Sequence, residues 1–279
     1  MAKKQRKHRF LNKHTILGVL VLIFIGMMVA QLPRGIFGQM GLSDSAAGVL
    51  IGIGSVLIVC LLMALYRRWF RPEYDGSSTR VDAKTVILLF VPLIILWCLS
   101  TLLGASHGDF LVVPTLAMIG EAMSAGFAEE LAFRGFGASY LMRQWTGEKS
   151  VIRTAWFIAI LFGVLHLANL FAGADPGYTL VQVIGATFIG LFLTAVFLRT
   201  GNLWVPIAMH VIHDIIAFAG QDVYQDGLIV ESVDTYALID MLLNIGLGIV
   251  GLYLIRRSKR GEIRALWDEK WSIKTREDD

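Results

Sequence analysis

Eight apolar runs, separated by short polar segments, constrain this chain more than any other feature. A helix needs about 20 mostly apolar residues to cross a membrane. The runs are approximately Thr15–Leu32, Ala46–Tyr66, Thr85–Gly104, Leu111–Glu130, Val151–Ala172, Leu180–Leu198, Leu203–Ala219 and Tyr236–Ile255. Only 17% of the residues are charged, against about 25% in soluble domains. We therefore predict an all-α polytopic membrane helix bundle with about eight transmembrane helices, and exclude soluble, disordered and disulfide-stapled secreted classes.

The distribution of positive charge predicts the orientation of these spans. If the N-terminus is cytoplasmic, Arg34 is the only one of the 25 Lys and Arg residues that falls in a predicted outer loop. Lys and Arg concentrate in the cytoplasmic loops of membrane proteins. Both termini are therefore predicted to be cytoplasmic. The basic residues are explained by topology and anionic lipid headgroups, so we expect no nucleic-acid partner.

The chain divides into a membrane domain and two short tails. Residues 1–14 form a basic cytoplasmic tail, and the apolar run that follows is too long for the core of a cleaved signal peptide. The membrane domain covers residues 15–255. Residues 256–279 alternate charged and apolar residues, which predicts a cytoplasmic tail with a short amphipathic helix on the inner membrane surface. Cys60 and Cys98 lie in apolar runs and are interpreted as small hydrophobic residues.

Ionisable residues inside the apolar runs are the main indication of function. One such residue at the centre of a span costs about 3 kcal/mol on insertion scales, so it usually faces a polar cavity or a partner. The residues are Glu121, Glu129, Glu130, His166, His210, His213, Asp214 and Asp240, with Arg134 close behind. We expect Asp240 to reach the outer interface, and Glu121 is a further candidate for lining the same cavity as Glu129.

The first cluster is Glu129-Glu130-x-x-x-Arg134. Residues four apart share a helix face, so Glu130 and Arg134 are predicted to form an ion pair. Glu129 points about 100° away and has no local cation. A partly desolvated, unpaired carboxylate of this kind suits a general base. We place Glu129 at the cytoplasmic end of the fourth span, which predicts a cavity open to the inner side.

Two further clusters lie in later spans. Phe162 and His166 share one face of the fifth span, and His210 and Asp214 share one face of the seventh. His213 points elsewhere and is expected to play a structural or supporting role. An acid, two histidines and an aspartate in three spans predict one convergent polar site.

These motifs, in this order, resemble those of the CPBP family (CAAX protease and bacteriocin-processing, also called Abi) of intramembrane proteases. The family pattern is E-E-x-x-x-R, then F-x-x-x-H, then H-x-x-x-N or D, and the resemblance covers about residues 110–220. It implies a glutamate-dependent endopeptidase without a cofactor or metal. Glu129, assisted by His166, would activate a water, and His210 with Asp214 would stabilise the oxyanion. Glu130 and Arg134 would hold the site together, with Phe162 in a supporting position.

Asp214 stands at a motif position where the prenyl-protein members of the family have Asn. An amide can donate a hydrogen bond to an oxyanion, whereas an ionised carboxylate cannot. Asp214 is therefore either protonated or orients His210 by accepting its ring N–H, and we favour orientation.

Two alternatives stay open from the sequence. Glu129, His166 and His210 could bind zinc in a metalloprotease with an open fourth position. The chain could also be a non-catalytic scaffold or regulator, while a transporter is disfavoured because no paired repeats or broken helices are visible. The expected partners are the lipid bilayer and a peptide or membrane protein, prenylated or leader-bearing proteins being candidate substrates. The expected location is a bacterial cell membrane.

Overall fold

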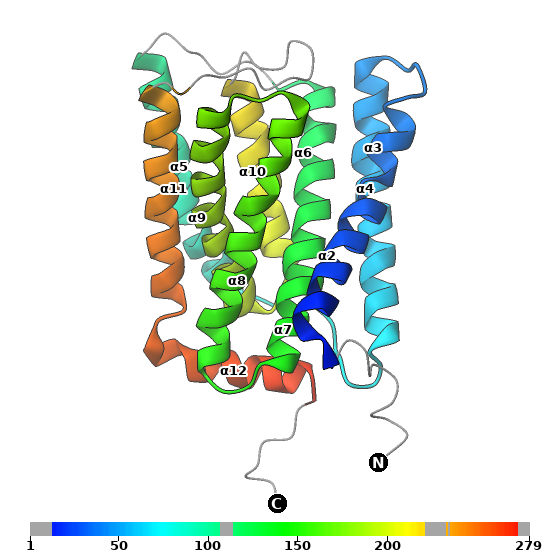
Figure 1. The fold of residues 1–279 in the computed structure, drawn as a ribbon, viewed down its shortest axis with the longest axis vertical. Coiled ribbons are helices and arrows are strands. Elements are labelled where there is room, and N and C mark those ends of the chain that lie inside the picture. The colour runs from blue at the N-terminus through cyan, green and yellow to red at the C-terminus, as the bar shows by residue number, and fades with distance from the viewer. Residues whose placement is uncertain (1–12, 107–113, 221–232, 234, 273–279) are drawn as a thin grey trace, which may run out of the picture.

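The computed structural model describes residues 13–106, 114–220, 233 and 235–272. The described residues form a helical bundle in which most helices run along its long axis (Figure 1). The α-helices are α2 (Thr15–Ala30), α3 (Leu32–Phe37), α4 (Asp44–Trp69), α5 (Ala83–Ser106), α6 (Leu116–Glu129), α7 (Ser139–Gln144), α8 (Lys149–Leu165), α9 (Pro176–Thr200), α10 (Trp204–Gly220), α11 (Thr235–Leu254) and α12 (Arg257–Lys270). A π-helix, η1 (Glu130–Ala138), and a 3-10 helix, η2 (His166–Ala172), complete the set.

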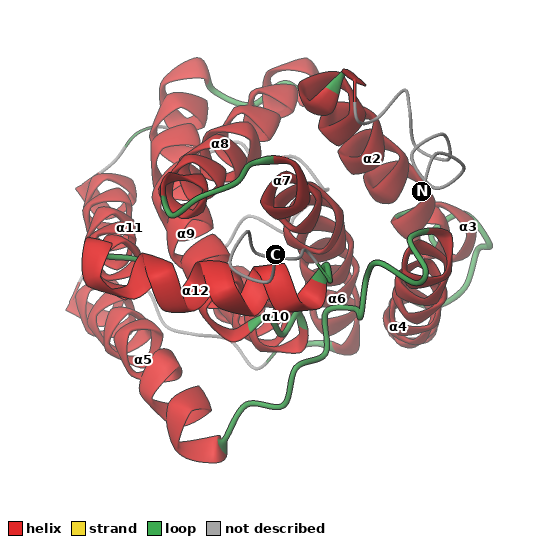
Figure 2. Ribbon diagram, turned by 90° about the horizontal axis from the view of Figure 1, so that it is seen from below, coloured by secondary structure: helices red, strands yellow, loops and turns green. Residues whose placement is uncertain are grey.

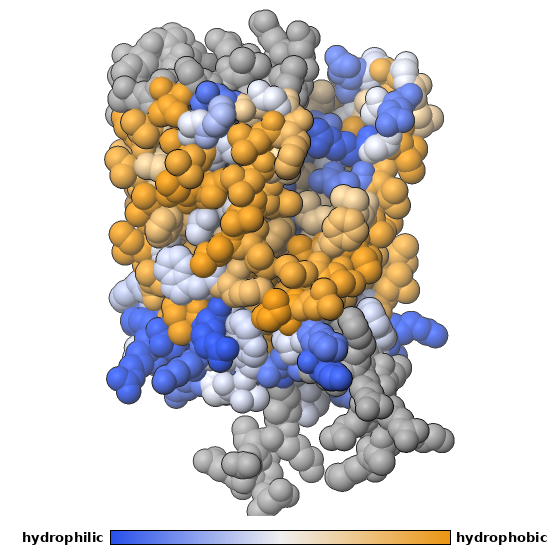
Figure 3. All heavy atoms as spheres, in the orientation of Figure 1, coloured by the Kyte–Doolittle hydropathy of each residue, from blue (hydrophilic) through white to orange (hydrophobic). Residues whose placement is uncertain are grey.

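Six helical segments are long and apolar enough to cross a membrane. They are Thr15–Phe37, Asp44–Trp69, Ala83–Leu102, Lys149–Ala172, Pro176–Thr200 and Ala237–Leu254. Large apolar side chains are exposed along them and form an apolar belt across the face seen in Figure 3. The predicted polytopic membrane bundle is confirmed, and the chain is a multi-pass integral membrane protein. The fourth and seventh predicted spans, which carry most of the ionisable residues, are not among the six; α10 is apolar but shorter.

The helical structure of the fourth predicted span continues beyond Glu130, where the sequence predicted its end. Helices α6, η1 and α7 follow one another from Leu116 to Gln144 without an intervening loop. Glu129 therefore lies near the middle of this rod, and its placement at a cytoplasmic end was wrong. The sequence pattern misled because Glu130 and Arg134 interrupt the apolar run without interrupting the helix. Glu130 Oε1 and the Arg134 guanidinium find partners within the bundle, so helical structure continues past them.

Helices α4 and α6 approach closely through small residues. A Cβ atom added at Gly48 would lie 2.2 Å from the carbonyl oxygen of Leu116, and one added at Gly120 would lie 2.2 Å from that of Gly48. No side chain fits at either position, since such distances are far inside van der Waals contact. Small residues at helix crossings are typical of membrane bundles. This crossing attaches α4 to the rod that carries Glu129.

Helix α12 lies across one end of the bundle, below the other helices in Figure 1 and in front of them in Figure 2. The indole nitrogen of Trp267 donates to the Leu198 carbonyl, and that of Trp271 donates to the Ser139 carbonyl. Both indoles are buried. The predicted amphipathic helix is therefore present, but its apolar face packs on protein rather than on lipid. Residues 273–279 of this tail, and residues 1–12 of the N-terminal tail, lie outside the described residues.

The segment between α4 and α5 also closes this end, which we call the α12 end. The amide of Leu203 donates to the Ser77 carbonyl at 2.8 Å, and the Asn202 side chain donates to the Thr79 carbonyl at 2.7 Å. Ser78 and Asn202 form an isolated antiparallel bridge. The segment therefore fixes the turn between α9 and α10, and with it the start of the helix that carries His210.

Candidate active site

The Glu130–Arg134 pair lies inside the bundle at the π-helix. Glu130 Oε1 is 2.8 Å from Arg134 Nη1, as expected, and both side chains are fully buried. Arg134 Nε donates to Thr194 Oγ1 and its Nη2 donates to the Gly190 carbonyl, at 3.2 and 3.0 Å. The guanidinium also lies 4.5 Å from the centre of the Phe162 ring. Partners from α8 and α9 therefore hold this charge pair, and π-helical segments of this kind often occur at functional sites.

His210 joins the charge pair to the two other carboxylates. Its Nδ1 is 2.8 Å from Glu130 Oε1. On the other side of the ring, Nε2 is 3.9 Å from Glu129 Oε2 and 3.5 Å from Asp214 Oδ1. Glu129 and Asp214 are 17% and 16% exposed, whereas Glu130 is completely buried. The two partly exposed carboxylates therefore flank the same nitrogen, where a small molecule can reach them.

This geometry offers Glu130 as a second candidate for orienting His210, beside Asp214. Glu130 Oε1 is shared between Arg134 and His210 Nδ1, so a His210 ring that carries a proton on Nδ1 is held in orientation by Glu130. Asp214 lies instead on the Nε2 side, too far for the strong hydrogen bond that orientation requires. The sequence indicated only Asp214 because it is the nearest acid along the helix, whereas Glu130 reaches His210 from a different helix.

Phe162 connects the second motif to the cluster around His210. Its ring lies 5.4 Å from that of His166 and 5.8 Å from that of His210. His166 Nδ1 is 3.1 Å from the Phe162 carbonyl oxygen, so Nδ1 carries the proton and Nε2 is left as an acceptor in the neutral ring. His166 also interacts electrostatically with His210 and Asp214. The three motifs are thus brought together, with α8 ending at Leu165 and His166 opening η2.

His213 lies apart from this cluster. Its Nδ1 accepts a hydrogen bond of 3.2 Å from the Trp97 indole of α5. This contact ties α10 to α5.

Sequence reasoning missed three residues of this environment, Trp97, Gly190 and Thr194. Each lies in an apolar helix without a motif around it, and a threonine there reads as an ordinary buried residue. Their roles depend on contacts between helices that are far apart in sequence.

Two of the intramembrane acids lie at other places. Glu121 pairs with Arg34 of α3 at 2.7 Å, rather than with the residues around His210. Asp240 accepts from the Asn244 side chain at 2.9 Å and from Ser100 at 3.5 Å. These partners lie on α5 and α11, and the expectation that Asp240 reaches toward the outer interface stays a prediction.

Within the described ranges, no group of three or more His, Cys, Asp and Glu residues is arranged to hold a metal ion. The zinc alternative is therefore a question for a chelator experiment, described below.

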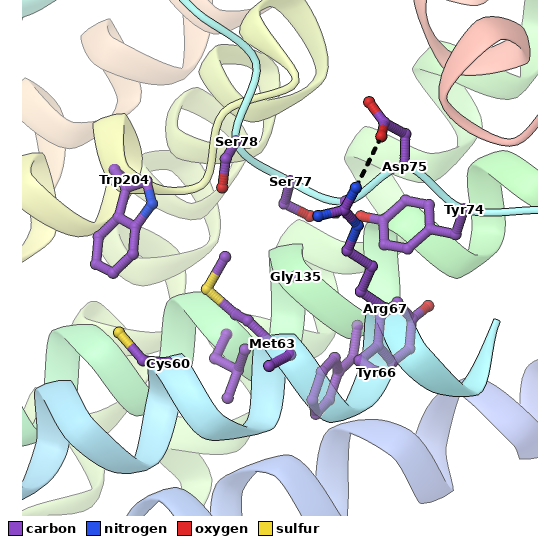
Figure 4. A pocket seen from close by; sticks show the side chains of 14 residues that line it. Cys60, Met63, Tyr66, Arg67, Tyr74, Asp75, Ser77, Ser78, Gly135 and Trp204 are labelled. Atoms are coloured by element: carbon purple, nitrogen blue, oxygen red, sulfur yellow. Dashed lines mark hydrogen bonds and ion pairs between the residues drawn. The ribbon is translucent and has the colours of Figure 1, made fainter. Parts of the chain in front are cut away.

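A cavity of about 270 Å³ lies beside the π-helix (Figure 4). Cys60 and Met63 of α4 line one side, Leu131 and Gly135 of η1 another, and Trp204 stands at the start of α10. The polar rim includes Ser77, Ser78 and the ion pair of Arg67 with Asp75, whose atoms are 3.1 Å apart. The cavity therefore adjoins the turn that follows Glu130 and has a polar edge toward the α12 end.

Comparison with known proteins agrees with the sequence motifs. A family model described as type II CAAX prenyl endopeptidase Rce1-like matches residues 110–216. No curated protein and no solved structure matches the chain. The matched segment begins just before α6 and ends within α10, and it contains all three motifs. This match over residues 110–216 supports the CAAX-protease family that the motifs resemble.

Proposed function

We propose that this protein is an intramembrane endopeptidase that hydrolyses a peptide bond with a water activated by Glu129 and His166. The observation that supports it most is the grouping of Glu129 and Asp214 around His210 Nε2, inside an apolar bundle. A buried charge pair, Glu130 with Arg134, backs this group and satisfies the other nitrogen of the ring. Such a polar group inside a membrane domain is typical of a functional site.

In this mechanism, Glu129 takes a proton from the water as its oxygen attacks the peptide carbonyl. The carbonyl oxygen becomes negatively charged in the tetrahedral intermediate. His210 stabilises it in its imidazolium form, which carries a proton on each ring nitrogen: Glu130 accepts the Nδ1–H, and the Nε2–H donates to the oxyanion. When the C–N bond breaks, the proton held by Glu129 passes to the leaving amine.

His166 and Asp214 complete the proposed site. Neutral His166, with its Nδ1 held by the Phe162 carbonyl, offers Nε2 as an acceptor to the water. Asp214 balances the charge of the His210 imidazolium from the Nε2 side. This assignment leaves orientation to Glu130 and makes no use of a metal.

We propose that the substrate reaches the site through the cavity between α4 and η1. The substrate is a membrane-associated peptide or protein, and prenylated proteins and leader-bearing peptides are the classes to test first. The apolar walls suit a lipid-embedded segment, and the polar rim at the α12 end suits the chain that follows it. The α12 end would be cytoplasmic by the charge distribution, in a bacterial cell membrane.

The test compares Glu129→Gln with Asp240→Asn by quantitative peptidomics of membranes from cells that produce each variant. Both substitutions turn an intramembrane carboxylate into an amide of nearly the same shape. Glu129→Gln is expected to abolish the peptides that the wild type generates, and Asp240→Asn to preserve them. Equal peptide patterns in wild type and Glu129→Gln would reject glutamate-dependent proteolysis.

Two further results would favour the alternatives. Stoichiometric zinc in the purified protein, with loss of cleavage after chelation and recovery after zinc is restored, would indicate a metalloprotease. A cellular phenotype that Glu129→Gln fully rescues in a deletion strain would indicate a scaffold or regulator.

A further inference from the structure

A second cleft opens between α3 and α6, at the end of the bundle opposite α12. Its volume is about 600 Å³, and it is lined by Gln31, Arg34, Gly35, Gly38, Gln39 and Glu121. Figure 3 shows hydrophilic side chains in a recess on the upper right of an otherwise apolar belt. A polar recess on a lipid-facing surface has to be filled by water or by a polar ligand, because hydrocarbon cannot satisfy its groups.

The depth of the cleft matches that of lipid headgroups. Arg34 follows the start of α2 at Thr15 by 19 positions in a nearly continuous helix. At 1.5 Å per residue this is about 28 Å, close to the thickness of the hydrocarbon core. If α2 begins at one interface, the guanidinium lies at the other, where phosphates are found.

The Arg34 side chain has donors available for a phosphate. Its Nε contacts Glu121 Oε2 at 2.7 Å, and the side chain is 56% exposed. In the described part of the chain, its two terminal amino groups donate no hydrogen bond to another side chain. A guanidinium binds phosphate oxygens with two parallel N–H groups, and the pair of amino groups leaves that arrangement possible.

The other residues that line the cleft suit a headgroup that carries both a positive and a negative charge. Glu121 is an acceptor for an ammonium group next to the guanidinium, and the Arg34–Glu121 pair has no net charge. Gly35 faces open space, with no atom within 4 Å of an added Cβ. Gln31 is fixed at the floor because its Oε1 accepts from Ser124 at 2.9 Å. A second negative group would meet the Glu121 carboxylate, which disfavours purely anionic ligands.

We propose that this cleft binds the headgroup of a zwitterionic phospholipid, with the phosphate on Arg34 and the ammonium group on Glu121. Phosphatidylethanolamine has the required chemistry, since its primary ammonium can donate hydrogen bonds to a carboxylate. The site is separate from the Glu129 cluster and does not depend on the peptidase proposal.

Native mass spectrometry of the delipidated full-length protein tests this site. The probes are phosphatidylethanolamine, phosphatidylglycerol and the chain-free headgroup glycerophosphoethanolamine. The wild type is expected to bind one phosphatidylethanolamine in preference to phosphatidylglycerol, and the free headgroup far more weakly. Arg34→Ala should lower the affinity for phosphatidylethanolamine about tenfold, as expected for the loss of a charge-assisted hydrogen bond.

The matched control is Arg68→Ala, which removes an exposed arginine at the α12 end of α4. It should leave the affinity for phosphatidylethanolamine unchanged. Gly35→Leu fills the cleft without changing its charge and should also weaken binding, while Glu121→Gln should remove the preference over phosphatidylglycerol. Equal loss in Arg34→Ala and Arg68→Ala, or unchanged binding in both Arg34→Ala and Gly35→Leu, would overturn the proposal. Equal affinity for the free headgroup would overturn the assignment to a lipid.

Discussion

The rod formed by α6 and η1 contributes to two acid–arginine pairs, and they differ in almost every respect except chemistry. Glu130 and Arg134 are fully buried, one turn apart, and held by Thr194, His210 and the Gly190 carbonyl. Arg34 and Glu121 join two helices at the surface, with side chains 56% and 20% exposed. The buried pair has its donors committed to protein, whereas the surface pair keeps donors for a ligand. The two pairs carry the same charges, so burial and the number of protein partners make the difference. A buried pair with many partners organises a site, whereas an exposed pair with few partners can bind a ligand.

The largest effect is expected when the buried pair is broken. Arg134→Ala leaves the buried Glu130 carboxylate without its arginine, with His210 still beside it, and removes three other contacts, so it should destabilise the fold by about 3–5 kcal/mol. Thermal unfolding in detergent measures this, and peptide cleavage should be lost as well. Wild-type stability in Arg134→Ala would contradict the view of this pair as structural.

A smaller effect tests how α9 supports the pair. Thr194→Val removes the acceptor of Arg134 Nε and leaves a buried charged donor unsatisfied, which should cost about 1–3 kcal/mol. Because His210 is oriented through Glu130, the catalytic rate should fall with little change in KM. The control is Thr187→Val on the same helix, whose hydroxyl bonds the carbonyl of Val183. If the two variants behave alike, Thr194 has no specific positioning role.

The next test concerns the cavity beside the buried pair. Cys60→Trp places a large side chain in the cavity that adjoins η1, whereas Cys98→Trp places the same side chain on an exposed surface of α5. We expect kcat/KM to fall about tenfold in Cys60→Trp, the equivalent of about 1.4 kcal/mol of lost transition-state binding, and to stay near wild type in Cys98→Trp. Equal activity in both variants would exclude the cavity as the substrate route.

The smallest stability effect belongs to the surface pair. Arg34→Ala should change the free energy of unfolding by less than about 1 kcal/mol in lipid-free detergent, since exposed ion pairs contribute little. Added phosphatidylethanolamine should raise the melting temperature of the wild type more than that of Arg34→Ala. A loss of stability comparable to that of Arg134→Ala would remove the distinction between the two pairs.

Much of this molecule could be predicted from the sequence because hydropathy and helical spacing are local properties. The apolar runs predicted a multi-pass helical bundle, and four-residue spacing predicted the Glu130–Arg134 pair. The three motifs also indicated the CAAX-protease family, and the family model that matches residues 110–216 agrees with them. Each of these inferences depends on residues close together along one helix.

The tertiary structure alone decided what the polar residues contact. It placed Glu129 in mid-helix, brought Glu130 to Nδ1 of His210, and paired Glu121 with Arg34. It also turned the C-terminal amphipathic helix onto protein and brought Thr194 to Arg134. The physical reason is the same in each case: a buried polar group is satisfied by whichever neighbour the packing of distant helices brings within about 3 Å, and sequence spacing carries no information on that packing.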